Sequence, residues 1–146
     1  MHLVFTKAAR LIFDAPQRAR VTPLLIQLHW LPVKARIIFK ICCMVYKVRQ
    51  SRSPEYLDDI LTKYQAATNV TLRNQIDKTR LKENTPKNKW DDRAFYFAAP
   101  NLFNKLSPEI REAENFGKFK RLLKTHLFEV SYNLEDETIV DTYSTR

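Results

Sequence analysis

The chain has 146 residues, enough for one domain with a modest core. It carries 25 Lys and Arg against 16 Asp and Glu, a net charge of +9 that favours contact with polyanions without defining a function. Its only glycine is Gly117, which excludes Gly-rich phosphate loops, Rossmann turns and nucleophile elbows because each of these needs more than one. The adjacent pair Cys42 and Cys43 fits neither a disulfide framework nor a zinc site.

Charge divides the chain into three parts. Residues 1–53 contain ten basic residues and one acid, Asp14. Residues 54–129 carry 14 basic and 11 acidic residues, and residues 130–146 carry one basic and four acidic residues. We therefore predict an ordered region over residues 1–129, with a basic and a mixed part, followed by a disordered, mobile acidic tail.

Neither a membrane span nor a secretory signal is expected. The most apolar window, residues 37–48, is short and is interrupted by Lys40 and Lys47. Lys7 and Arg10 interrupt the first apolar residues, unlike the core of a signal peptide. An acid-poor start is also typical of mitochondrial presequences, but here the basic bias continues well beyond their usual length.

Proline and capping residues predict helices in the first third. Thr6 is placed to cap a helical turn over residues 7–13, which Pro16 ends. The pair Thr22-Pro23 predicts a second helix, with Thr as the N-cap and Pro at the first helical position.

The best-defined predicted helix covers residues 32–49. At 100° per residue, one predicted buried face is formed by Ile37, Ile41, Met44, Val45 and Val48. A narrow basic stripe on the same helix contains Arg36, Lys40 and Lys47. Most of the circumference is apolar, so we expect neighbours on more than one side.

The second half continues the helical pattern after a weaker stretch. Ser53-Pro54 predicts a further capped helix, and a weak β-hairpin or a loop is expected within residues 70–88. Helical spacing returns after residue 93, with Pro100 expected to kink or split the segment. Ser107-Pro108 starts a short turn, and Asn115 is a candidate N-cap for a last helix.

These elements predict a small, mainly α-helical domain of five to seven helices. Its expected core contains Trp30, Ile37, Ile41, Val45, Leu57, Leu61, Phe95, Leu102, Phe116, Phe119 and Leu123.

An acidic pair resembles a polymerase motif. The string Tyr56-Leu57-Asp58-Asp59 has the Tyr-x-Asp-Asp form with which reverse transcriptases hold Mg²⁺ on a turn between strands. That chemistry needs a third carboxylate on a neighbouring strand, and Asp14 is the only acid before Glu55. Acids are also expected in the first turn of a helix, where the helix dipole favours them. We therefore predict that the pair opens a helix and that the chain has no catalytic residue.

No metal or cofactor site is expected. His2, His29 and His126 are far apart in the sequence and have no Cys or carboxylate at ligand spacing. Cys42 and Cys43 would point about 100° apart on a helix, and we expect them to be buried as small apolar groups.

Basic residues of the first part are the remaining functional candidates. They would neutralise phosphates of RNA or DNA in a salt-dependent way: Arg10, Arg18, Arg20, Lys34, Arg36, Lys40 and Lys47, with Arg49 and Arg52 extending the series. Four rings are candidates for stacking on bases: His29, Trp30, Phe39 and Tyr46. The alternative is that the rings belong to the core and the charges form a solvated face.

An ordered series of short strings extends over residues 6–128. The most specific is Leu28-His29-Trp30-Leu31-Pro32-Val33. Others are Lys7-Ala8-Ala9-Arg10-Leu11-Ile12, Leu102-Phe103-Asn104-Lys105-Leu106, Pro108-Glu109-Ile110-Arg111 and Leu123-Lys124-Thr125-His126-Leu127-Phe128. Together they resemble the C-terminal region of the reverse-transcriptase polyprotein of non-LTR (LINE-type, jockey-like) retrotransposons.

The resemblance implies a truncated, non-catalytic fragment of an RNA-directed DNA polymerase. In the full-length family an endonuclease and the polymerase precede this region, so the fragment would pack beside the polymerase part and assist RNA or DNA binding. In the family, the segment that matches residues 54–59 comes after the catalytic Tyr-x-Asp-Asp motif of the polymerase. The resemblance therefore assigns no catalytic residue to this chain. An independent basic nucleic-acid-binding module is the alternative. Neither reading includes a small-molecule substrate or a membrane partner.

Overall fold

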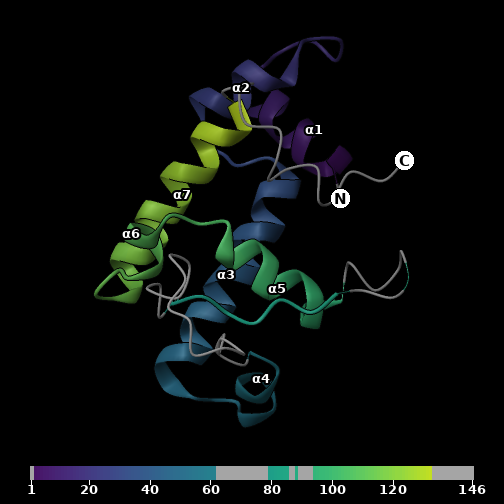
Figure 1. Cartoon of the computed structure of the whole chain (residues 1–146). Coiled ribbons are helices and arrows are strands. Elements are labelled where there is room, and N and C mark those ends of the chain that lie inside the picture. Colours follow the sequence, from purple (N-terminus) through teal and green to yellow (C-terminus); the bar gives the residue numbers. More distant parts are fainter. Residues whose placement is uncertain (1, 62–78, 86–87, 89–93, 133–146) are drawn as a thin grey trace. The chain divides into compact units, whose positions relative to one another are not determined.

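The computed structural model describes residues 2–61, 79–85, 88 and 94–132 (Figure 1). Within them there are seven helices: α1 (His2–Ile12), α2 (Val21–Gln27), α3 (Val33–Ser51), α4 (Glu55–Ile60), α5 (Phe95–Asn104), α6 (Pro108–Arg111) and α7 (Phe116–Tyr132). The predicted mainly α-helical fold is confirmed over this part of the chain. Most of the predicted hairpin or loop over residues 70–88, and the predicted tail beyond Tyr132, lie outside the described residues.

The chain packs as two units. The first unit contains residues 1–37 and 124–146, and the second contains residues 38–123. Both boundaries fall inside helices, α3 and α7. The sequence-based division at residue 53 followed charge, whereas this division follows packing.

In the first unit, α1 begins earlier than the sequence predicted. The helix begins at His2, so Thr6 lies inside it and the prediction that Thr6 is an N-cap is wrong. Its hydroxyl donates to the Leu3 carbonyl at 3.0 Å, which satisfies the buried group inside the helix. The helix ends at Ile12, and Asp14 has a left-handed φ of 47°, a conformation that Asp adopts more readily than most residues.

The second helix also starts differently from its prediction. Its N-cap is Arg20, which makes no capping hydrogen bond from its side chain, so the assignment of Thr22 as N-cap is wrong. Pro23 still lies in the first turn, where its missing N–H costs little. After α2, the Trp30 ring stacks on Phe5 at 4.8 Å, and the Tyr132 hydroxyl donates to the Trp30 carbonyl at 2.6 Å.

On α3 the buried face is rotated from the predicted one. Ile37 and Met44 are exposed, so their assignment to the core face is wrong. The buried residues of this helix are Ala35, Ile38, Cys42, Cys43, Val45, Tyr46 and Val48. Because apolar residues cover most of the circumference, periodicity alone could not choose between adjacent faces.

An aromatic cluster forms the centre of the second unit. The Tyr46 ring on α3 stacks on Phe119 of α7 at 4.2 Å, and Phe103 of α5 lies 6.3 Å from the Phe119 ring. The Tyr46 hydroxyl donates to the Ala113 carbonyl at 2.6 Å in a buried hydrogen bond.

The predicted core is confirmed for five residues, which are buried: Val45, Leu61, Leu102, Phe119 and Leu123. Five other residues of the predicted core are half-buried: Trp30, Ile41, Leu57, Phe95 and Phe116.

The remaining helix starts show which capping predictions hold. Asn115 caps α7, because its Oδ1 accepts the Lys118 N–H at 2.7 Å. Pro108 occupies the first turn of α6 after Ser107, as predicted. For α4 the N-cap residue is Pro54, so the prediction of a Ser53 cap is wrong.

Asn104 at the end of α5 binds the segment of residues 79–85 to that helix within the second unit. Its Oδ1 accepts the Leu81 N–H at 2.9 Å, and its Nδ2 donates to the Leu81 carbonyl at 2.8 Å. One side-chain amide thereby satisfies both backbone groups of a buried residue.

The Tyr46 hydroxyl provides a direct test of the second unit's packing. Tyr46→Phe keeps the ring but leaves the Ala113 carbonyl without this donor, which should lower the free energy of unfolding by about 1–2 kcal/mol. Urea denaturation measures the change. Tyr56→Phe is the matched control, since Tyr56 is exposed, and it should change stability by less than about 0.5 kcal/mol. Equal effects of the two substitutions would contradict this packing.

Both cysteines are buried and free, as the sequence predicted. Burial, and to a smaller extent the neighbouring Cys43, raises the pKa of the Cys42 thiol from its ordinary 9.0 to about 12. For Cys43, burial raises the pKa, while the charges of Lys120, Lys40 and Lys47 oppose the shift.

The Cys42 pKa predicts a loss of stability at alkaline pH. Above pH 9 the unfolded chain releases this proton while the folded chain keeps it, so the free energy of unfolding falls as pH rises toward about 12. The slope from this group approaches about 1.4 kcal/mol per pH unit. Urea unfolding between pH 8 and 10.5 should show a steeper decline for the parent than for Cys42→Ala. Parallel curves would contradict the assignment.

Candidate nucleic-acid interface

Arg10 has a place inside the fold of the first unit. This half-buried side chain extends from α1, and its Nη2 donates to the Ala19 carbonyl at 3.1 Å. The bond holds the loop between α1 and α2, so a structural role accounts for Arg10 better than contact with phosphate does.

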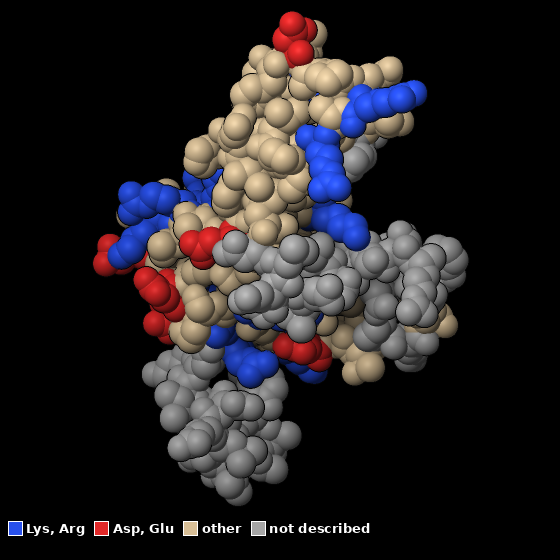
Figure 2. All heavy atoms as spheres, turned by 90° about the horizontal axis from the view of Figure 1, so that it is seen from above, with Lys and Arg blue, Asp and Glu red and all other residues tan. Residues whose placement is uncertain are grey.

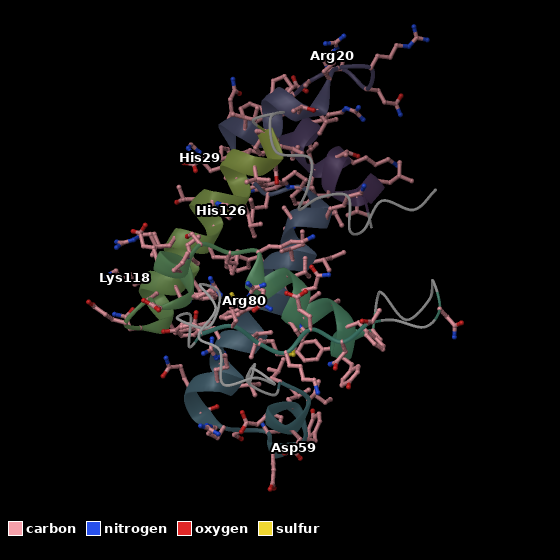
Figure 3. All side chains as sticks on the ribbon, viewed as in Figure 1. Arg20, His29, Asp59, Arg80, Lys118 and His126 are labelled. Carbon is pink, nitrogen blue, oxygen red and sulfur yellow. The ribbon has the colours of Figure 1, made fainter. Side chains whose placement is uncertain are left out.

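Four other candidates of the first unit are exposed. Arg18 and Arg20 lie in the loop between α1 and α2, and Figure 3 shows Arg20 directed away from the helices. Lys34 and Arg36 lie in the first turn of α3, where the Arg36 guanidinium is 4.9 Å from the centre of the Phe5 ring. None of the four pairs with an acidic residue that the structure describes. The charges of Arg18, Arg20 and Lys34 therefore face solvent, whereas the guanidinium of the exposed Arg36 lies over the Phe5 ring.

Lys40 and Lys47 belong to the second unit, where the structure adds a third cation. Lys47 and Lys120 both lie over the Phe116 ring, each at 4.8 Å, and the charges of all three lysines reach the Cys43 thiol. We call Lys40, Lys47 and Lys120 the lysine cluster. Sequence reasoning missed Lys120 because it lies on α7, more than 70 residues after the other two, and no local pattern connects them.

The aromatic candidates are engaged in packing. His29 stacks on Phe128 at 5.8 Å, and Trp30 stacks on Phe5. Tyr46 is buried in the second unit, and Phe39 is half-buried. These contacts favour packing over base stacking for Trp30 and Tyr46, whereas His29 is exposed, and charge remains the main candidate interaction.

The acidic pair lies on a helix, as predicted. Asp58 and Asp59 belong to α4, and Asp58 Oδ2 accepts from Arg52 Nη1 at 3.3 Å. In the described part of the chain no three His, Cys, Asp or Glu side chains are grouped so that they could hold a metal ion.

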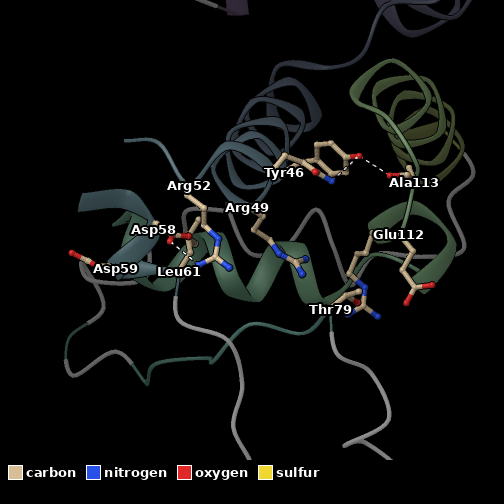
Figure 4. A pocket seen from close by; sticks show the side chains of 11 residues that line it. Tyr46, Arg49, Arg52, Asp58, Asp59, Leu61, Thr79, Glu112 and Ala113 are labelled. Atoms are coloured by element: carbon tan, nitrogen blue, oxygen red, sulfur yellow. Dashed lines mark hydrogen bonds and ion pairs between the residues drawn. The ribbon is translucent and has the colours of Figure 1, made fainter. Parts of the chain in front are cut away.

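A pocket of about 570 Å³ lies in the second unit (Figure 4). Three arginine side chains line it: Arg49 from the last turn of α3, Arg52 just after the end of that helix, and Arg111 from α6. The first two continue the basic series of the N-terminal third, whereas Arg111 was not a candidate. Figure 2 shows basic and acidic side chains together on one face of the molecule, so that face is not uniformly basic.

No family model matches the sequence, and no curated protein or solved structure matches it either. Among the described helices, none is both long and apolar enough to cross a membrane.

Arg10 offers a test that separates folding from binding. Arg10→Gln removes a charge-assisted hydrogen bond to Ala19 and should lower the free energy of unfolding by about 1.5–3 kcal/mol. Thermal or urea denaturation measures the loss. The exposed Arg18→Gln is the control and should change stability by less than about 0.5 kcal/mol. If the Arg10→Gln protein is as stable as this control, the structural role of Arg10 is wrong, and Arg10 is again a candidate for binding phosphates.

Proposed function

We propose that this chain is a non-catalytic helical module, related to the C-terminal region of non-LTR retrotransposon reverse transcriptases, that holds RNA or DNA by its phosphates. The observation that carries this proposal is the exposure of Arg18, Arg20, Lys34 and Arg36 in a stretch of 53 residues with a single acid. The lysine cluster adds positive charge in the second unit. Such side chains gain affinity by releasing counterions from the polyanion, without reading its sequence.

The exposed apolar face of α1 supports the second part of the proposal, packing beside a polymerase. Leu3, Val4 and Leu11 are 72%, 72% and 84% exposed. A group of apolar side chains on one helix is costly to leave in water and is typical of an interaction surface. In the proposed setting, the polymerase part of the parent polyprotein covers this face.

An independent binding module is the alternative, favoured by the same exposed cations. The two differ in what the isolated chain does. A module that works alone binds oligonucleotides at moderate salt, whereas a module that works beside a polymerase binds weakly alone and self-associates through α1. Sedimentation of the parent chain and of Leu3→Ser/Leu11→Ser distinguishes them.

Salt dependence tests the proposed contact with phosphates. The affinity of the chain for a single-stranded oligonucleotide should fall steeply between 50 and 200 mM salt. Arg18→Gln/Arg20→Gln/Lys34→Gln should weaken binding and reduce the slope of log K against log salt by about 2, since each phosphate contact contributes about 0.7. Fluorescence anisotropy measures both quantities.

Lys118→Gln is a suitable control because Lys118 pairs with Glu114 at 3.6 Å. It should leave the slope within about 0.3 of the parent value, less than half of one phosphate contact. A parent affinity that does not depend on salt, or a triple variant with the parent's slope, would contradict the proposal.

A further inference from the structure

Another pocket, small and apolar, lies within the first unit. Five apolar side chains from α1, α2, the connection after α2 and the start of α3 line it: Phe5, Leu25, Pro32, Val33 and Ala35. Its volume of about 240 Å³ is below the roughly 300–1,000 Å³ of pockets that hold cofactors and drug-sized ligands. The pocket therefore suits one or two aliphatic side chains of a peptide better than a cofactor.

Positive charge lies beside this apolar pocket. Lys34 lines it and is exposed, and the Arg36 guanidinium lies 4.9 Å from the centre of the ring of Phe5, which also lines it. Asp14 and Glu129 are the only acidic residues that the structure describes in this unit, and neither lines the pocket. An apolar hollow beside two such cations is complementary to an aliphatic residue that stands next to carboxylates.

The end of α7 lies at the same pocket. Ser131 lines it, and the Tyr132 hydroxyl donates to the Trp30 carbonyl in the connection before α3. Residues 133–146, which lie outside the described part of the chain, follow directly. They are therefore tethered beside the pocket, and a short tether gives an effective concentration on the order of millimolar.

The sequence of residues 133–146 has the matching chemistry. It contains four acidic residues and one basic residue. Leu134 is followed by the acidic run 135–137, and it stands three residues after Ser131, a distance of about 10 Å at most along an extended chain. Asn133 belongs to the residue types that favour the turn after a helix, where the next apolar residue packs back on the last helical turn.

We propose that this pocket is a docking site for residues 133–137 of the same chain, with the Leu134 side chain in the pocket and the carboxylates that follow facing Lys34 and Arg36. The aliphatic contact carries most of the affinity, since exposed ion pairs add little, and the carboxylates set the position. The docked segment screens two cations that the proposed function assigns to nucleic acid. This screening rests on the proposed function, whereas the docking itself does not.

Carbodiimide cross-linking of the full chain tests the docking directly. The reagent forms an amide bond between a lysine amine and a carboxylate only where the two groups touch, and mass spectrometry of the monomer locates the bond. We expect Lys34 to be joined to Glu135 or Glu137 in preference to Lys124. Lys124 is an exposed lysine of the same unit that lies closer to this segment along the chain, so tethering alone would favour it.

Leu134→Ser is the test variant, and Ile139→Ser is the matched control because it makes the same kind of change outside the docked residues. Leu134→Ser removes the aliphatic contact and should lower the yield of the Lys34 cross-link by about threefold or more. It should also raise the affinity for a single-stranded oligonucleotide at low salt by about threefold. Ile139→Ser should match the parent in both measurements.

A preferred Lys34 cross-link that falls in Leu134→Ser alone supports the docking site. Equal yields at Lys34 and Lys124, an equal fall in Ile139→Ser, or cross-links found only in dimers overturn it. If the cross-link behaves as expected while oligonucleotide binding is absent or independent of salt, the docking site stands and the proposed function fails. If binding depends on salt but Lys34 shows no preferred cross-link, the docking site fails and the proposed function stands.

Discussion

The contact between Tyr46 and Phe119 is the interaction on which the second unit depends. The stacked rings join α3 to α7, and the Tyr46 hydroxyl fixes the backbone at Ala113. The same junction determines where two groups of basic residues lie. It places Lys47 and Lys120 over one ring, Phe116, and it positions the end of α3 beside residues 111–113, where the arginine-lined pocket forms.

The helices themselves could be predicted because proline, capping residues and apolar spacing mark them locally. Asn115 has the side chain and position of a cap and is one. Thr6 and Thr22 failed as caps because each helix begins before the residue, which a single polar side chain does not reveal. The buried face of α3 was misplaced by about one residue because its apolar residues surround the helix, so only the neighbouring elements decide between Ile37 and Ile38.

The sequence could identify candidate contacts with nucleic acid only from the density of basic residues along the chain. Basic residues without acidic neighbours in the sequence identified Arg18, Arg20, Lys34 and Arg36, which are indeed exposed. Composition could not distinguish them from Arg10, whose guanidinium bonds to the Ala19 carbonyl across a loop. Nor could it add Lys120 or Arg111, which join α3 only through tertiary packing.

The central claim is that exposed cations of the N-terminal third hold a nucleic-acid backbone. Amide chemical-shift mapping during titration with a single-stranded oligonucleotide tests it most directly, because it reports where contact occurs without altering the charge of the chain. The largest shifts should fall at residues 18–20 and 34–36 and should diminish as salt is added. Shifts confined to α4 and α5, or no shifts at low salt, would contradict it.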